Sequence, residues 1–257
     1  MRRSKTLARL KNNDTVRMCC LGHYIPAYIK HAAHFGYDCI WLDLEHRNWT
    51  DRDVQAILSF SHQFDIDIML RAPTLEKIRL YRYLEDGAAG LMIPHVNTPE
   101  RARMLVDAVK FPPLGDRGLD AAGQDGDFFL NDADDYVAEM NQQTFLVVQL
   151  ETPEAISNAE AIVAIDGIDG VFIGPGDLGL RLKHHSGDLT LDGAVEQVAA
   201  VCRKHAKAWG LPVTSPEILQ RRRAQGGQLL NYGGEFGAIV DMLKNCAAAF
   251  ETDAEKV

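Results

Sequence analysis

Two acidic residues each close an apolar run that reads as a strand. Glu151 follows the run FLVVQL, and Asp177 follows the run GVFIGPG. Thr152 and Pro153 predict a helix start between the runs, because Thr caps helices well and Pro suits the first helical position. A strand–helix–strand crossover leaves the C-terminal ends of both parallel strands on one edge of a sheet. We therefore expect Glu151 and Asp177 to be neighbours in space.

Neighbouring carboxylates repel each other unless they share a proton or a cation. Their oxygen atoms are the ligands that hard divalent ions such as Mg2+ and Mn2+ prefer. Gly174 and Gly176 precede Asp177 and allow the backbone to approach a ligand closely. Taken alone, Glu151 could simply cap the following helix, so the interpretation depends on the pair. The pattern favours a divalent-metal site.

The composition restricts the class of protein. The 257 residues are 46% hydrophobic and carry a net charge of -9, which argues against nucleic acid or an anionic membrane as the main partner. The five cysteines show no metal-binding spacing and fit free thiols in a reducing cytosol. The basic start is followed by no apolar signal core, and no run approaches membrane-spanning length. We expect a cytoplasmic protein.

Eight short apolar runs alternate with helical patterns along the chain. Short, wholly apolar strands are typical of a parallel sheet that is buried on both faces. This count at this length favours a (β/α)8 barrel over an open doubly wound sheet, and no composition break divides residues 1–257 into two domains. The expected strands are Thr15–Gly22, Cys39–Leu44, Ile66–Arg71, Gly90–Val96, Phe145–Leu150, Gly170–Gly176, Leu211–Ser215 and Gln228–Gly233.

Charged and polar groups concentrate where these strands end, which is where a barrel of this type carries its chemistry. No lysine occurs at any of these ends, which argues against Schiff-base catalysis. Taken singly, His46 fits a structural histidine and Arg71 fits a rim ion pair, so the set matters more than its members. The residues at the ends are Asp43, Glu45, His46, Arg71, His95, Glu151, Asp177, Ser215 and Asn231.

Several segments together resemble the HpcH/HpaI family of class II pyruvate aldolases. They are FGYDCIWLDLEH, MLRAP, GAAGLMIPHVNTPERA, KFPPLGDRG, VQLETPEAISN and GIDGVFIGPGDLG, in the order and spacing of the family. The resemblance implies a (β/α)8 barrel that uses Mg2+, Mn2+ or Co2+. It implies reversible cleavage of a 4-hydroxy-2-oxo acid into pyruvate, or a related 2-oxo acid, and an aldehyde through a metal-bound enolate.

The resemblance also assigns roles to residues of this sequence. It implies that Glu151 and Asp177 hold the metal and that Arg71 stabilises the oxyanion. It makes His46 the base, with Asp43 supporting it. The backbone amides from Gly174 through Gly176 to Asp177 would receive the substrate carboxylate. These are largely the groups that the strand ends already indicate.

Some positions depart from the family pattern. Leu44 stands where Gly is often found, His95 stands where an apolar residue is common, and the first strand ends in the unusual GHY. These departures leave the aldehyde open. An enzyme that decarboxylates oxaloacetate, or one that adds the same enolate to another acceptor, remains an alternative. A degenerate barrel that only binds a partner is the non-enzymatic alternative.

The resemblance further implies a homohexamer built as a trimer of dimers, with the C-terminal helix at about 236–250 exchanged between subunits. An apolar face on this helix is compatible with exchange, although a core helix of the same chain would look alike. The irregular segment 111–135, with Arg117, is a candidate to line a neighbour's site. The apolar face consists of Phe236, Ile239, Val240, Leu243 and Phe250.

Overall fold

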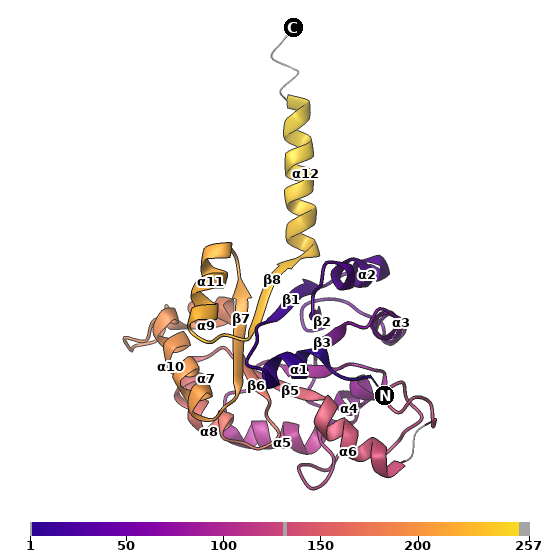
Figure 1. Cartoon of the computed structure of the whole chain (residues 1–257). Coiled ribbons are helices and arrows are strands. Elements are labelled where there is room, and N and C mark those ends of the chain that lie inside the picture. The colour runs from indigo at the N-terminus through magenta and orange to yellow at the C-terminus, as the bar shows by residue number, and fades with distance from the viewer. Residues whose placement is uncertain (1, 131–132, 252–257) are drawn as a thin grey trace.

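A closed barrel of parallel strands forms the centre of the molecule. The computed structural model describes residues 2–130 and 133–251. Its strands pair in sequence order, and β1 closes the barrel against β8 (Figure 1). This confirms the predicted (β/α)8 fold. The strands are β1 (Val16–Leu21), β2 (Cys39–Asp43), β3 (Asp67–Arg71), β4 (Gly90–Ile93), β5 (Phe145–Leu150), β6 (Gly170–Ile173), β7 (Ala208–Val213) and β8 (Leu229–Gly234).

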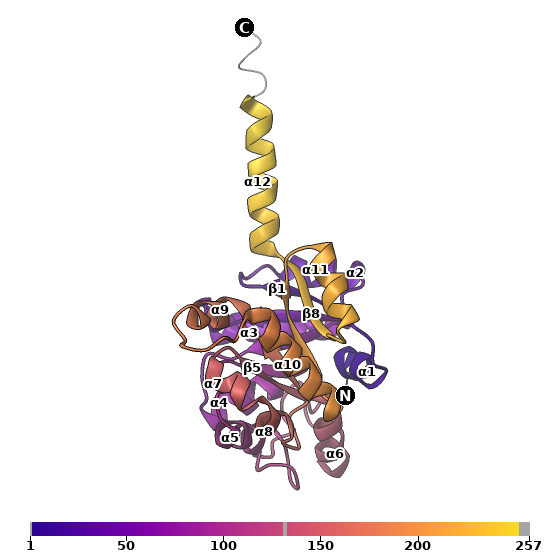
Figure 2. The ribbon, with the colours of Figure 1, turned by 90° about the vertical axis from the view of Figure 1, so that its left-hand side faces the viewer.

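Helices follow the strands and surround the barrel (Figures 1 and 2). Within the described residues, none of them has both the length and the apolar character that crossing a bilayer needs. The helices are α1 (Lys5–Lys11), α2 (Pro26–His34), α3 (Asp51–Gln63), α4 (Lys77–Glu85), α5 (Pro99–Val109), α6 (Ala133–Gln143), α7 (Pro153–Ser157), α8 (Ala159–Val163), α9 (Pro175–Leu182), α10 (Leu191–Lys204), α11 (Pro216–Ala224) and α12 (Glu235–Glu251).

Alternation along each strand separates two apolar cores. On β5, Phe145 and Val147 belong to a cluster inside the barrel, whereas Leu146 and Val148 belong to the larger cluster between the barrel and its helices. Successive side chains of a strand point to opposite faces, so Gln149 follows Val147 into the interior. The polar residues of the strand ends therefore enter the barrel above its inner apolar core.

The sequence predicts helix caps at Thr50 or Asp51, at Thr98 and at Thr152, and the three threonines cap helices in the structure. The Thr50 side chain accepts a hydrogen bond from the Asp53 amide in a capping box with the Asp53 side chain, at the start of α3. The side chains of Thr98 and Thr152 also accept hydrogen bonds at the starts of α5 and α7, and each is followed by Pro at the first helical position. Local polar chemistry thus fixes where the chain turns back from the barrel.

The apolar spacing of the sequence predicts one long helix from Asp192 to Trp209, and this prediction is wrong at its C-terminal end. Helix α10 ends at Lys204, and β7 already begins at Ala208. Ala206 has a φ of 51°, in the left-handed region that ends helices. Trp209 then packs as a strand residue in the outer core. The apolar periodicity did not reveal this break, because both elements bury the same kind of side chain.

The single helix predicted after Glu151 is in fact two short helices. Asn158 ends α7 and begins α8. Its side-chain amide donates to the backbone carbonyl of Asn97 at 2.8 Å. This bond ties the junction of the two helices to the loop after β4.

Helix α12 extends away from the barrel instead of covering it (Figure 1). Its apolar side chains are exposed, from 39% for Ile239 to 82% for Phe250. The interpretation of α12 as a core helix of its own barrel is therefore wrong for the described chain. Among the described residues, none packs over the predicted apolar face of α12.

The irregular segment after α5 folds against its own chain. Arg117 is buried, and its Nη2 donates to Asp125 Oδ2 at 2.8 Å and to the Tyr136 hydroxyl at 3.1 Å. Its guanidinium also stacks on Phe111, 4.5 Å from the ring centroid. Arg117 thus packs inside its own subunit, and the expectation that the segment lines a neighbour's site stays a prediction. Residues 131 and 132 of the segment lie outside the described residues.

Two glycines, one in a barrel strand and one in an outer helix, differ in the space that their neighbours leave for a side chain. A Cβ on Gly210 of β7 would lie 1.8 Å from the backbone oxygen of Leu229, its partner on β8. We expect Gly210→Ala to cost about 3 kcal/mol or more, because that carbonyl cannot move without breaking the sheet. Gly179→Ala meets no atom within 4 Å in α9 and should gain up to about 1 kcal/mol. Urea unfolding of both variants measures this, and equal stabilities would contradict it.

Candidate functional site

Charged side chains from successive strands meet at the C-terminal mouth of the barrel. Asp43 and Arg71 are register partners at the ends of β2 and β3. His95 follows β4, and Glu151 follows β5, whose Leu150 pairs with Ile173 of β6. The closed barrel therefore brings residues far apart in sequence to one opening.

Arg71 lies between two carboxylates. Its Nε donates to Asp43 Oδ1 at 3.0 Å, and its Nη2 lies 2.8 Å from Asp43 Oδ2. Its Nη1 lies 3.0 Å from Glu45 Oε2, and the guanidinium stacks on Trp41 at 4.7 Å from the ring centroid. A guanidinium carries five N–H groups, so this buried side chain is held firmly and still has donors for a ligand.

Asp43 organises the loop after β2. Its Oδ1 accepts hydrogen bonds from the backbone amides of Glu45 at 3.1 Å and His46 at 3.3 Å. Burial alone would raise the pKa of Asp43, but the hydrogen bond and charge of Arg71 outweigh it and hold that pKa below its usual value. Asp43 is therefore an ionised anchor that supports the His46 backbone.

The imidazole of His46 stands at the mouth of the barrel. Its side chain is 55% exposed, and its Nε2 lies 3.7 Å from Glu45 Oε2. The expected support from Asp43 reaches the backbone amide of His46. The ring is thus free to face a molecule that enters the barrel.

His95 bridges the two halves of the site. Its Nδ1 lies 2.6 Å from Glu151 Oε1, and its Nε2 lies 3.1 Å from Glu45 Oε1. Its backbone amide also donates to Glu151 Oε1 at 2.8 Å. His95 has a φ of 56°, a conformation uncommon for a residue with a side chain. His95, which stands where the family commonly has an apolar residue, therefore makes polar contacts inside the site.

Glu151 is a buried carboxyl in a negative environment. Burial raises its pKa, and the charges of Glu45 and Asp177 raise it further, while the hydrogen bond and charge of His95 oppose them. Asp177 is within electrostatic reach of Glu151, and its Oδ1 is paired with Arg181. Two carboxylates thus share this side of the mouth, as the crossover requires.

The donor set fits a hard divalent cation. A Cβ on Gly174 would lie 2.7 Å from Glu151 Oε2 and 2.8 Å from Gln149 Nε2, so only glycine leaves room beside this carboxylate. Gln149 Oε1 is buried in the barrel and has no hydrogen-bond partner among the residues that the structure describes. Oxygen ligands of this kind are what Mg2+ and Mn2+ bind. Among the described residues no group of three or more His, Cys, Asp or Glu is placed to hold a metal ion. Glu151 and Asp177 would leave positions for water or substrate.

The start of α9 supplies backbone donors beside the carboxylates. Gly174 is its N-cap, and the amide of Leu178 makes the first intrahelical bond, to the Gly174 oxygen at 2.9 Å. The amides of Gly176 and Asp177 precede that bond, as at every helix N-terminus. Space is open beside Gly176, where an added Cβ would meet no atom within 4 Å. A carboxylate could bind these amides.

Comparison with known proteins identifies the family. Residues 18–240 match the model of the HpcH/HpaI aldolase/citrate lyase family. The chain belongs to this family. It is 32% identical to a hydroxypyruvate/pyruvate aldolase of Roseovarius nubinhibens over 95% of each chain. It is 31% identical to a 2-keto-3-deoxy-L-rhamnonate aldolase of Klebsiella pneumoniae over 87% of this chain and 84% of that one.

A solved structure of an HpcH/HpaI aldolase from Desulfitobacterium hafniense has the same architecture. It matches with a TM-score of 0.86 and 25% identity, over 97% of this chain and 96% of that one. The resemblance seen in the sequence is confirmed, and the chain is an enzyme of this aldolase and lyase class. The non-enzymatic alternative thereby loses its basis.

Two buried polar residues, Gln149 and Glu235, were not predicted from the ends of the expected strands. Gln149 lies within β5, and the signal was a single polar residue in the otherwise apolar run FLVVQL. Glu235 is 3% exposed, and its Oε1 accepts from the backbone amides of Gly22 at 2.6 Å and His23 at 3.0 Å. No local pattern announces Glu235, because its partners are more than 200 residues away.

Other candidates have structural roles. Ser215 caps α11, its hydroxyl accepting from the amide of Ile218. Burial raises the pKa of the Cys19 thiol to about 11 and that of Cys20 to about 12. Both cysteines are therefore protonated near neutral pH and are poor nucleophiles. Asn231 is the exception: it is buried on β8, and within the described part of the chain its Oδ1 has no hydrogen-bond partner.

The Asp43–Arg71 pair predicts a pH dependence of stability. The pKa of Asp43 is lower in the folded protein, so the ionised pair stabilises the fold above about pH 4, the unfolded value, and this contribution is lost as pH falls through the folded pKa. Asp43→Asn should cost about 3 kcal/mol at pH 7, with a smaller difference from wild type below pH 4.

Urea unfolding of wild type and Asp43→Asn at pH 7 and at acid pH measures this difference. The matched control is Asp116→Asn, because Asp116 pairs with Lys77 on the surface, where ion pairs contribute little. A difference between wild type and Asp43→Asn that is constant with pH would show that the pair does not lower the pKa of Asp43.

Proposed function

We propose that this chain is a divalent-metal-dependent aldolase. It reversibly cleaves a 4-hydroxy-2-oxo acid into pyruvate, or a related 2-oxo acid, and an aldehyde. The observation that supports it most is the connected set at the barrel mouth, where Arg71 and Glu151 are linked through Glu45 and His95. This set places a fixed cation opposite a pair of carboxylates. The aldolase names of both relatives agree with it.

Deprotonation of the methyl group of pyruvate creates negative charge on the keto oxygen, and that charge needs stabilisation. Asp43 and Glu45 hold Arg71 in place before any substrate arrives. The protein therefore spends no reorganisation energy on placing this guanidinium during the reaction. Preorganised charge of this kind is commonly the largest contribution to catalysis. We assign the oxyanion to the free N–H groups of Arg71.

Glu151 and Asp177 would hold the divalent cation, with Gln149 close to Glu151. A bound cation would act as a Lewis acid that polarises the keto group. The amides of Gly176 and Asp177 would bind the substrate carboxylate. The cation and the two amides together would hold a 2-oxo acid in one orientation at the mouth of the barrel.

His46 would move the proton. Its imidazole is exposed at the mouth, and an imidazole nitrogen within reach of a substrate can accept a proton, which suits a general base. Asp43 fixes the backbone that carries the ring. In the cleavage direction the same ring would accept the proton of the 4-hydroxyl group, and the bond between C3 and C4 would break.

Exchange of the methyl protons of pyruvate with deuterium from solvent tests this function without knowledge of the aldehyde. We expect exchange with Mg2+, Mn2+ or Co2+, loss of exchange in chelator, and recovery when metal is added back. Proton NMR follows the loss of the methyl signal. Full exchange in chelator would exclude the metal-dependent mechanism.

Arg71→Ala is the matched variant in the same assay. We expect it to lower the exchange rate by about 100-fold or more, the scale of losing an oxyanion stabiliser. Its folded state is checked by circular dichroism, since Asp43 and Glu45 lose their partner. Near-normal exchange would remove Arg71 from the proposed mechanism.

We further propose that α12 is exchanged between subunits of a homo-oligomer, a hexamer built as a trimer of dimers. The helix leads away from the barrel and exposes Ile239, Val240 and Leu243 along its length. Exposed apolar patches of this kind mark interaction sites. A second copy of this chain supplies a complementary surface.

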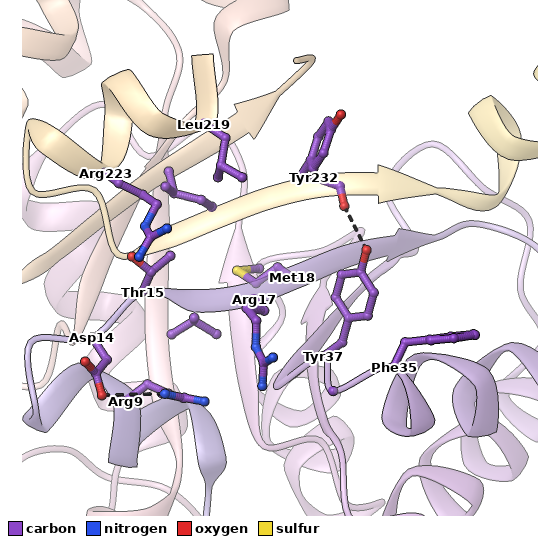
Figure 3. Close-up of a pocket in the computed structure, with 13 residues that line it drawn as sticks. Arg9, Asp14, Thr15, Arg17, Met18, Phe35, Tyr37, Leu219, Arg223 and Tyr232 are labelled. Atoms are coloured by element: carbon purple, nitrogen blue, oxygen red, sulfur yellow. Dashed lines mark hydrogen bonds and ion pairs between the residues drawn. The ribbon is translucent and has the colours of Figure 1, made fainter. Parts of the chain in front are cut away.

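That surface is a groove on the outside of the barrel. A cavity of about 620 Å3 lies along β1 and β8 between α2 and α11 (Figure 3). Leu219, Leu230 and Tyr232 contribute apolar lining. In a (β/α)8 barrel the helix after the last strand joins the outer ring, and here α12 leaves that place free. We propose that an exchanged helix covers this side of the barrel.

Ile239→Asp combined with Leu243→Asp tests the exchange. We expect this variant to have a smaller mass than wild type by size exclusion with light scattering, because two charges would be buried in the interface. Asp241→Ser, on the same helix, is the control and should keep the wild-type mass. A monomeric wild type, or an unchanged mass in the double variant, would refute the proposal.

A further inference from the structure

The first turn of α12 lies against the loop that carries His46. We propose that Arg47, held on the ring of Phe236, is a positioning residue that fixes His46 at the mouth of the barrel. The proposal rests on the proposed function, in which His46 moves the substrate proton. It makes the start of the last helix a part of the catalytic apparatus.

Arg47 connects the helix to the backbone of His46. Its Nη1 donates a hydrogen bond to the carbonyl oxygen of His46 at 2.7 Å. Its guanidinium carbon lies 4.4 Å from the centroid of the Phe236 ring, within the range of a cation–π interaction. The Phe236 ring thereby holds the guanidinium of Arg47, and the guanidinium holds the carbonyl group of His46.

Phe236 is itself fixed by the loop after β1. Its ring packs on the ring of His23 with the centroids 4.1 Å apart. A Cβ on Gly22 would lie 2.9 Å from Phe236 Cε2 and 3.0 Å from Arg47 Nε. The aromatic ring and the guanidinium therefore fill the space that glycine leaves open.

A buried carboxylate anchors this arrangement. Glu235, which precedes Phe236, accepts from the amides of Gly22 and His23 through Oε1, and His23 Nδ1 lies 3.1 Å from the same oxygen. Breaking these bonds would leave a buried acceptor without partners, which is costly. The first turn of α12 is therefore tied to the end of β1.

His46 is held from two sides as a result. Asp43 accepts from its backbone amide inside the barrel, and Arg47 donates to its carbonyl outside. The imidazole is the part left free. Arg47 is exposed, so its contacts contribute little to global stability, and their loss should be visible mainly in catalysis.

Pyruvate proton exchange by Arg47 variants of the full chain tests the proposal. We expect Arg47→Ala to lower kcat for exchange about 10-fold or more, with KM within about 2-fold, since a small misplacement of a catalytic group is costly. Arg47→Lys can still reach the carbonyl and the ring, and it should recover most of kcat. Phe236→Leu should resemble Arg47→Ala, and combining the two should add little, because both break one connection.

Arg52→Ala is the control, because Arg52 is exposed at the start of α3 and should leave kcat unchanged. Melting temperature and mass in solution are measured for every variant. A kcat within 2-fold of wild type in Arg47→Ala would overturn the proposal, as would a loss that Arg47→Lys does not recover. If His46→Ala leaves exchange intact, the proposed role of His46 fails and this proposal with it. Absence of exchange in wild type would instead refute the proposed function.

Discussion

A guanidinium inside a barrel must be matched by carboxylates, and the pairing of Arg71 with Asp43 determines the arrangement of the site. The two residues face each other across β2 and β3 because the strands pair in register. Once Arg71 is fixed there, Glu45 can reach it from the same loop, and the other oxygen of Glu45 lies beside His95. One ion pair therefore determines where Glu45 and His95 can lie.

The site as a whole is negative, although its most firmly held side chain is a cation. Asp43, Glu45, Glu151 and Asp177 outnumber the guanidinium groups of Arg71 and Arg181 that pair with them. The raised pKa of Glu151 reflects this excess together with burial. A divalent cation at the carboxylates would remove the excess charge, and it would then allow an anionic 2-oxo acid to enter. Under the proposed function, this negative charge would favour binding of the metal before the anionic substrate.

Sequence predicted the parts of this molecule that depend on local chemistry. Strands of wholly apolar residues, helix caps such as Thr50 and Thr152, and acidic residues at strand ends are all encoded within a few positions, and the barrel follows from their order. Contacts between distant loops were not predictable in this way. The bridge from His95 to Glu45, and the anchoring of Gly22 by Glu235, depend on three-dimensional closure. The break before Trp209 was missed because helix and strand bury similar side chains there.

The direction of α12 follows from how the last strand ends. Gly233 has a φ of 95°, a conformation open to glycine, and it reorients the chain at the end of β8. Glu235 then binds the loop after β1, which keeps the chain at the mouth of the barrel instead of letting it return along the outer face. The helix that follows must point away from the strands. Its apolar side is therefore exposed and the groove along β1 and β8 stays open, while the same carboxylate holds the loop on which Phe236 packs and, through Phe236, supports Arg47.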